Sequence, residues 1–276
     1  MAVEMLSYIE RQSPVHRLAG ATKLIVFLLF STAAMLTYDT RVLLVLLVIS
    51  LLIFKVSKIK IKEVGFVLLF ILIFLLLNNL AIYLFSPQEG VRIYGSSHEW
   101  FHIWGRYNMT QEQLFYQFNV TLKYFVVIPV ALLFIVTTHP SEFAASLNKI
   151  GVNYKIAYSV SLALRYIPDI QRDFRTISQS QQARGVDISR NEKLTKRIKN
   201  VSAIIFPLIL SSLDRIEVIS HAMELRGFGK NKKRSWYSEK KATRSDVITL
   251  IVAVLIFVFS VWLTLQNGSR FYNPFQ

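Results

Sequence analysis

Residues 177–185 read ISQSQQARG, and residues 219–227 read ISHAMELRG. A shift of 42 positions superimposes the Ile-Ser pair and the Arg-Gly pair of the two runs together. Upstream of each run, apolar residues recur in steps of three and four, which is typical of one face of an α-helix. They are Ile156, Val160, Leu164, Ile167, Ile170, Phe174 and Ile177 in the first segment, and Ile205, Ile209, Leu213, Ile216, Ile219 and Met223 in the second. The sequence therefore predicts two long amphipathic helices that share a C-terminal signature.

The Arg-Gly pairs predict how the two helices end. Each glycine stands where a left-handed C-terminal cap favours glycine, and each arginine lies at the negative end of a helix dipole. Ordinary helix termination explains one such pair, but it explains a repeated Ile-Ser-x5-Arg-Gly less well. Arginine also suits bidentate pairing with a carboxylate in an interface groove. We therefore expect both helix tips to dock to a partner, through Ala183, Arg184 and Gly185 in the first tip and Leu225, Arg226 and Gly227 in the second.

The remainder of the chain has the composition of a membrane protein. Hydrophobic residues make up 53% of the 276 residues and aromatic residues 13%, more than an ordinary soluble domain needs. The apolar runs cover residues 24–38, 42–54, 64–85, 119–138 and 246–265. The first two are shorter than the ~20 residues that cross a bilayer, so we interpret them as one helical hairpin extended by flanking residues. The predicted fold is an all-α integral membrane protein, a transmembrane helix bundle that carries long amphipathic cytoplasmic helices.

Charge predicts the sidedness of the chain and its division into regions. Residues 139–245 contain 20 Lys and Arg against 9 Asp and Glu, within a total net charge of +15. The positive-inside rule places this segment in the cytoplasm, and it accounts for the charge without nucleic acid as a partner. We expect N-terminal transmembrane helices in residues 1–138, a cytoplasmic helical module in 139–245, and a last transmembrane helix and tail in 246–276.

Three local patterns lead to smaller expectations. Asn78 and Asn79 interrupt an apolar run, where they either form hydrogen bonds within the bundle, the reading we favour, or contact a moving partner. Ser141 is a candidate N-cap for a helix that begins after the fourth run. Asp169 and Asp173 lie one helical turn apart, and we expect them to pair with Arg165, Arg172 and Arg175 rather than to hold a metal-bound phosphate.

One motif predicts a different function. His98-Glu99-Trp100-Phe101-His102 matches H-E-x-x-H, which on a helix places two imidazoles on one face to bind zinc and supplies a glutamate as general base. The alternative function is therefore a zinc-dependent membrane metalloprotease. Gly95 and Gly105 leave room for barely two helical turns, and the motif lies in a polar loop rather than in an apolar span. A chance match, with aromatic residues at the membrane surface, is the simpler explanation.

The sequence contains no G-x-x-x-x-G-K-[ST], so ATP hydrolysis by that route is excluded. No G-x-S-x-G and no cysteine is present, which also excludes a nucleophile elbow and thiol chemistry. We expect a non-catalytic protein that binds no metal or cofactor of its own.

The chain resembles the transmembrane T components of energy-coupling factor transporters, the EcfT/CbiQ family. The residues that carry the resemblance are Arg165-Tyr166-Ile167-Pro168, Gln182-Ala183-Arg184-Gly185 and Leu225-Arg226-Gly227-Phe228, with support from Ser13-Pro14-Val15-His16-Arg17-Leu18, Lys23, Thr137-Thr138, Pro140, Leu147 and Gly151-Val152. The family signature is Ala-Arg-Gly twice, and Leu225 departs from it.

The resemblance implies a multi-pass protein of the bacterial plasma membrane that works in a complex of four proteins. Its partners would be two ABC-type ATPases, which bind the ATP and magnesium, and a small membrane S component that binds a vitamin or metal ion. The two amphipathic helices would be coupling helices whose arginine tips dock in one ATPase each. Motion driven by ATP would then reach the S component through this chain, which would itself act as a scaffold.

Overall fold

The structure is a computed structural model that describes residues 8–9, 11–104, 107–186, 194–231, 235–237, 240–266 and 269–275. It forms two compact units, residues 1–146 with 239–276 and residues 147–238. The division falls at 146/147 and 238/239 rather than at the expected 138/139 and 245/246. The assignment of residues 139–245 as a functional module stays a prediction.

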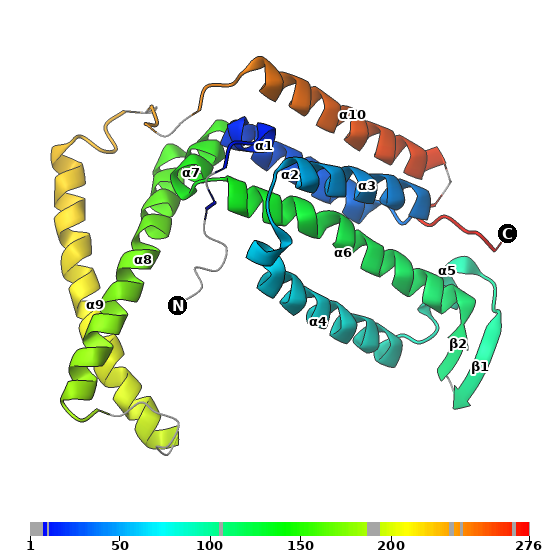
Figure 1. Cartoon of the computed structure of the whole chain (residues 1–276), viewed down its shortest axis with the longest axis horizontal. Helices are drawn as coiled ribbons and strands as arrows, with labels where there is room; N and C mark the ends of the chain where they lie inside the picture. The colour runs from blue at the N-terminus through cyan, green and yellow to red at the C-terminus, as the bar shows by residue number, and fades with distance from the viewer. Residues whose placement is uncertain are drawn as a thin grey trace. The chain divides into compact units, whose positions relative to one another are not determined.

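The first unit is a helical bundle whose long helices run side by side (Figure 1). The described elements of this unit are α1 (Pro14–Arg17), α2 (Gly20–Leu36), α3 (Thr40–Val56), α4 (Ile61–Phe85), α5 (Glu89–Tyr94), β1 (Glu99–Trp104), β2 (Tyr107–Thr110), α6 (Gln111–Thr137), most of α7 (Pro140–Lys149) and α10 (Arg244–Gln266). We call the end that holds α1, the end of α6 and the start of α10 the basic end. Lys23, Lys55, Lys62 and Lys240 also lie there.

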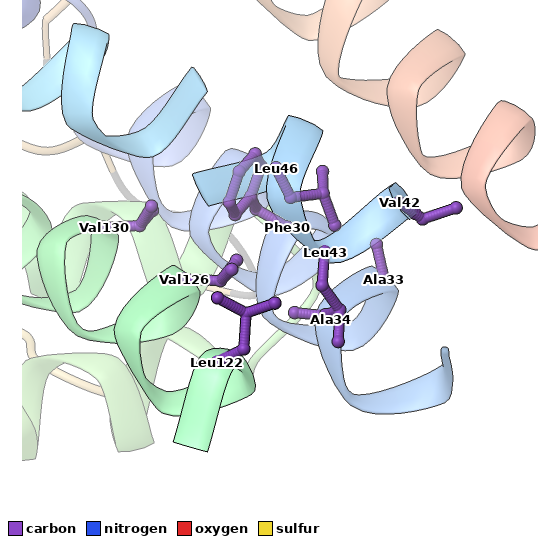
Figure 2. Packing of buried hydrophobic residues seen from close by; sticks show 9 residues of the cluster. All are labelled: Phe30, Ala33, Ala34, Val42, Leu43, Leu46, Leu122, Val126 and Val130. Atoms are coloured by element: carbon purple, nitrogen blue, oxygen red, sulfur yellow. The ribbon is translucent and has the colours of Figure 1, made fainter. Parts of the chain in front are cut away.

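A tight hairpin joins α2 and α3, as expected from the sequence. Asp39 ends the turn and caps α3, because its carboxylate accepts a hydrogen bond from the Arg41 amide at 2.9 Å. Both helices have 17 residues, near the lower limit for a membrane span. Their facing sides pack against α6, which is the central helix of the unit. Figure 2 shows the core that the three helices share, made of Phe30, Ala33, Ala34, Val42, Leu43, Leu46, Leu122, Val126 and Val130.

Three helices are long and apolar enough to cross a membrane: α4, α6 and α10. Only α6 is largely buried within the unit, whereas α4 and α10 expose most of their apolar side chains. Asn79 of α4 forms hydrogen bonds to α6: its side-chain nitrogen donates to the Thr121 hydroxyl at 2.9 Å, and its backbone carbonyl accepts from the Gln117 side chain at 3.1 Å. The expectation of hydrogen bonds within the bundle is confirmed for Asn79. It is not confirmed for Asn78, whose buried Oδ1 has no hydrogen-bond partner among the described residues.

The segment between α4 and α6 contains a short helix and an antiparallel β-hairpin, where the sequence predicts only a polar loop. In β1 and β2, Glu99 pairs with Thr110 and Trp104 with Tyr107, with two irregularities in register. The C-terminal tail lies against the same end of the bundle. The Tyr38 amide donates to the Arg270 carbonyl at 2.9 Å, and Phe271 stacks on Tyr38 with ring centroids 4.4 Å apart.

The start of α7 corrects the expected position of a helix cap. The Phe143 amide donates to the His139 carbonyl at 2.9 Å, so His139 caps α7 and Pro140 occupies its first position. Ser141, the expected N-cap, lies inside the helix, and its hydroxyl contacts the His139 ring at 2.6 Å. A proline is well suited to the first position because it lacks the amide hydrogen that would otherwise be unpaired there.

Candidate docking helices

The second unit contains the two amphipathic helices that the repeat predicts. They are α8 (Tyr154–Ala183) and α9 (Leu194–Leu225), about 45 and 48 Å long at 1.5 Å per residue. The two helices cross each other (Figure 1). They run antiparallel, because Phe228, just past the end of α9, packs against Tyr154 and Tyr158 at the start of α8, with ring centroids 5.7 and 4.9 Å away.

The first tip has the predicted left-handed cap. Gly185 has a φ of +83°, and its amide donates to the Gln182 carbonyl at 3.0 Å. The Val186 amide reaches back to the Gln181 carbonyl, also at 3.0 Å. These two bonds define a Schellman motif, which satisfies carbonyls that the helix end would otherwise leave unpaired.

The second tip repeats the first bond for bond. Gly227 has a φ of +68° and donates to the Glu224 carbonyl at 2.9 Å, and the Phe228 amide donates to Met223 at 2.9 Å. Both tips are therefore closed in the same way, and the prediction of glycine caps at positions 185 and 227 is confirmed.

A third Schellman motif shows which part of the tips is ordinary helix termination. It closes α7, where Gly151 has a φ of +107° and the Val152 amide donates to the Leu147 carbonyl at 3.0 Å. The residue before that glycine is Ile150, whereas the α8 and α9 tips carry arginine there. The glycine thus ends the helix, and the arginine is the feature that needs a further explanation.

The tip side chains face solvent in the isolated chain. Arg184 and Arg226 are both exposed, and no described residue forms an ion pair with either of them. Leu225, which occupies the position of Ala183 in the first tip, is 90% exposed, an unusual environment for a leucine. Each tip therefore presents a guanidinium without a carboxylate partner in the described part of the chain.

An ion pair joins the two helices where they cross. The Arg215 guanidinium of α9 binds the Asp173 carboxylate of α8, and the two side chains are 33% and 31% exposed. Asp169 pairs with Arg172 at 3.0 Å, as the sequence predicts, but Asp173 does not pair along its own helix. The expected partner of Asp173 is corrected: spacing within one helix cannot reveal a partner on another helix.

The crossing ion pair has the same spacing as the sequence repeat. Asp173 and Arg215 are 42 positions apart, the shift that superimposes Arg184 on Arg226. A twofold rotation that exchanges two antiparallel helices brings equivalent residues into contact only on its axis. The contact between Asp173 and Arg215 therefore marks a local pseudo-twofold axis. Both arginine tips lie 11 residues beyond it, about 16 Å along each helix in opposite directions.

Apolar side chains of both helices remain open on the surface of this unit. Ile156 and Ile167 on α8 are 59% and 48% exposed, and Ile209 and Leu213 on α9 are 51% and 54% exposed. The apolar faces that predict α8 and α9 from the sequence are therefore only partly buried between these two helices. Faces of this kind mark an interaction surface or membrane contact.

The zinc motif lacks the geometry that zinc proteases use. Residues 99–104 form strand β1, so successive residues advance about 3.3 Å and positions 98 and 102 are roughly 13 Å apart along the backbone. The His98 ring instead contacts the Glu112 carboxylate, with Nδ1 2.6 Å from Oε1. The same carboxylate accepts from the Ser96 hydroxyl at 2.9 Å and from the His98 amide. Glu112 therefore fixes the base of the hairpin, and the helical interpretation of H-E-x-x-H is wrong. The side chain of His102 lies outside the described residues.

Comparison with known proteins agrees with this architecture. The family model described as "Cobalt transport protein" (CbiQ) matches residues 11–237. Among similar proteins, the "Energy-coupling factor transporter transmembrane protein EcfT" of Exiguobacterium sibiricum is 27% identical over 93% of this chain and 97% of its own length. The protein of the same name from Brevibacillus brevis is 26% identical over 92% of this chain and 96% of its own. The one from Limosilactobacillus fermentum is 31% identical over 58% of this chain and 62% of its own.

The residues matched by the family model include both arginine tips, the crossing ion pair and four of the five long helices of the first unit. The apolar helices α4, α6 and α10 make the chain a membrane protein. It belongs to the EcfT/CbiQ family, the transmembrane components of energy-coupling factor transporters.

Proposed function

We propose that this chain is the coupling subunit of an ABC-type importer, and that it transmits the motion of two ATPases to a substrate-binding S component. The pair of arginine tips carries this proposal. The two tips are closed by the same hydrogen bonds and lie at equal sequence distances from one ion pair. A twofold arrangement of this kind fits a partner that is itself a pair of similar subunits.

Each tip offers what a groove with a carboxylate would recognise. The Schellman cap fixes the backbone at the helix end, so the arginine side chain starts from a rigid position. A guanidinium can bind both oxygens of a carboxylate, which adds direction to the contact as well as energy. We infer that Arg184 docks in one ATPase and Arg226 in the other, and that the ATP and magnesium are bound there.

The rest of the second unit would relay the motion. The crossing pair holds α8 and α9 at one point, so a displacement of one tip is passed to the other as a rotation about that point. The exposed apolar faces of both helices would meet the S component and the membrane. We propose that the protein resides in the bacterial plasma membrane, with the basic end of the first unit facing the cytoplasm. The transported substrate, a vitamin or a metal ion, would be chosen by the S component.

Charge reversal at both tips tests the docking step. The variant with Arg184→Glu and Arg226→Glu should insert in the membrane but lose its ATPases, because it places two carboxylates where carboxylates are expected in the partners. Co-purification of the two ATPases from native membranes, together with substrate uptake by whole cells, measures the loss. Each single reversal should weaken attachment of one ATPase more than that of the other.

A matched control separates the tips from the total charge. The variant with Arg175→Glu and Lys199→Glu makes the same change of charge on exposed positions of α8 and α9 that are at least nine residues from either tip arginine along the chain. It should keep its ATPases. If the tip variant still purifies with both ATPases and supports uptake, or if the control variant loses them equally, then the docking assignment is wrong.

A further inference from the structure

A large cavity lies at the basic end of the first unit. Its volume is about 610 Å³, within the ~300–1,000 Å³ range of small-molecule sites. It lies between α1, the start of α2, the end of α3, the end of α6 and the start of α10. None of the residues at the tips or on the crossing helices lines it. Its deep wall is apolar and is formed by Val26, Phe27, Leu52, Ile53, Val130, Leu133 and Phe134.

The wall nearest the basic end is polar and positively charged. Lys23 and Arg17 both line the cavity, as do the hydroxyl residues Thr243, Ser245 and Thr249. Lys23 is 6% exposed, and its ammonium donates to the Thr137 carbonyl at 2.8 Å. No carboxylate among the described residues is within ion-pair distance of either cation. Neither cation is therefore held in a direct ion pair with a described carboxylate.

A buried hydroxyl beside the cavity also lacks a partner among the described residues. Thr137 is fully buried and lines the cavity beside Lys23, and no described residue forms a hydrogen bond with its Oγ1. A buried polar atom without a partner costs free energy, so native structures supply one from protein, water or ligand. Lys23 and Thr137 are joined by the hydrogen bond to the Thr137 carbonyl and lie together where the polar wall meets the apolar wall.

Two nearby carboxylates, Glu142 and Asp246, offset part of the positive charge of this wall. Asp246 accepts from the Ala19 amide at 2.7 Å and from the Thr243 amide and hydroxyl at 2.8 and 2.7 Å, so neutral donors hold its carboxylate outside any direct ion pair. Glu142 pairs with Lys240 at 3.1 Å. With Glu142 paired to Lys240, the two cations Arg17 and Lys23 stand against one remaining carboxylate, Asp246, so the cavity entrance keeps a net positive charge.

We propose that this cavity binds one anionic phospholipid. Its acyl chain would occupy the apolar wall, and its phosphate would lie between Arg17 and Lys23. An apolar slot that ends in cations at the cytoplasmic boundary of a helix bundle matches both halves of such a lipid. The lipid would connect α1, α2 and α6 to α10, and this role is independent of the docking of ATPases at the tips.

Lipid titration followed by native mass spectrometry tests the proposal. The full chain would be purified in a mild detergent, freed of native lipid, and titrated with phosphatidylglycerol or phosphatidylcholine of the same acyl chains. We expect one phosphatidylglycerol to bind more tightly than phosphatidylcholine. Arg17→Gln removes an exposed cation and should weaken phosphatidylglycerol binding by about tenfold, the effect of one charge-assisted contact. Val26→Trp fills the space beside the apolar wall and should weaken the binding of both lipids.

Lys62→Gln is the matched control, because Lys62 is an exposed cation of the basic end that does not line the cavity. It should leave the affinity for phosphatidylglycerol unchanged. The proposal is overturned if the two lipids bind equally well, which would mean an unselective hydrophobic slot. It is also overturned if Lys62→Gln weakens binding as much as Arg17→Gln, which would mean attraction by surface charge alone.

Discussion

Exchanging the charges of the crossing ion pair tests whether it holds α8 against α9. Asp173→Arg or Arg215→Asp alone would place two like charges where opposite charges now meet. Both side chains are about one-third exposed, so solvent screens the pair. A pair of this kind contributes about 0.2–1 kcal/mol, and we expect the upper end of that range because the guanidinium holds the carboxylate in direct contact. A single reversal both removes this attraction and adds a repulsion, so it should cost about 2 kcal/mol.

The double variant with Asp173→Arg and Arg215→Asp restores opposite charges at the crossing. Thermal unfolding of the purified chain in detergent measures the effect, since 1 kcal/mol shifts Tm by about 2–4 °C in proteins of this size. Each single reversal should lower Tm by roughly 4–8 °C, and the double variant should recover more than half of that loss. If the two single effects simply add in the double variant, the two residues do not interact and the crossing is held by other contacts.

The absence of native cysteine allows the same variants to be examined by spin labelling. Labels at Gln179→Cys and His221→Cys occupy exposed positions that are related by the 42-residue shift. Both lie six residues beyond the crossing, so their backbones should be separated by at most about 18 Å plus the width of the helix pair. A single charge reversal should broaden the distance distribution, and the double variant should narrow it again. Equal distributions in all variants would refute a role of the pair in setting the crossing.

Two further predictions concern the glycine caps of α8 and α9 and the buried His16 of α1. Gly185→Ala and Gly227→Ala should each lower the free energy of unfolding by about 1 kcal/mol, because alanine is strained at φ values of +83° and +68°. Gly65→Ala in the interior of α4 is the control and should be neutral or stabilising. Thermal unfolding of the three variants measures the difference. Burial lowers the pKa of His16 from its ordinary value of 6.5, and the nearby cations Lys23 and Lys240 lower it further, so the unfolded chain binds the proton first. The stability contributed by neutral His16 should be present above pH 6.5 and lost as the pH falls below it, and His16→Gln should remove that part of the pH dependence of Tm.

The sequence predicts the helix ends well because their chemistry is local. A glycine after a helical run satisfies backbone groups within six residues, so Gly185 and Gly227 can be assigned without knowledge of the fold. The apolar periodicity is equally local, and it predicts α8 and α9 with their faces. The repeat also contained a signal for the crossing pair, because Asp173 and Arg215 are related by its 42-residue shift. The shared spacing indicates a contact only once α8 and α9 are known to pack antiparallel, and the sequence does not show that packing.

The β-hairpin shows the limit of motif matching. Residues 99–104 are rich in aromatic side chains that favour strands, but the H-E-x-x-H pattern invites a helical interpretation. Contacts with distant residues, such as the hydrogen bonds from Ser96 and His98 to Glu112 of α6, stabilise the strand rather than a helix. The cavity at the basic end was also beyond reach from the sequence, since five separate elements form it.

The pseudo-twofold relation holds for the register of the tips but not for their surroundings. Ala183 of the first tip corresponds to Leu225 of the second, and leucine adds an exposed apolar side chain beside the arginine. The second tip is also held by Phe228, whose ring packs on Tyr154 and Tyr158, while the position equivalent to Phe228 in the first tip is Val186. If two partners dock at these tips as proposed, we expect both to offer an acidic site for the arginine and to differ in the surface next to it. On the proposed function, the groove that receives Arg226 should carry an apolar patch that the groove for Arg184 lacks.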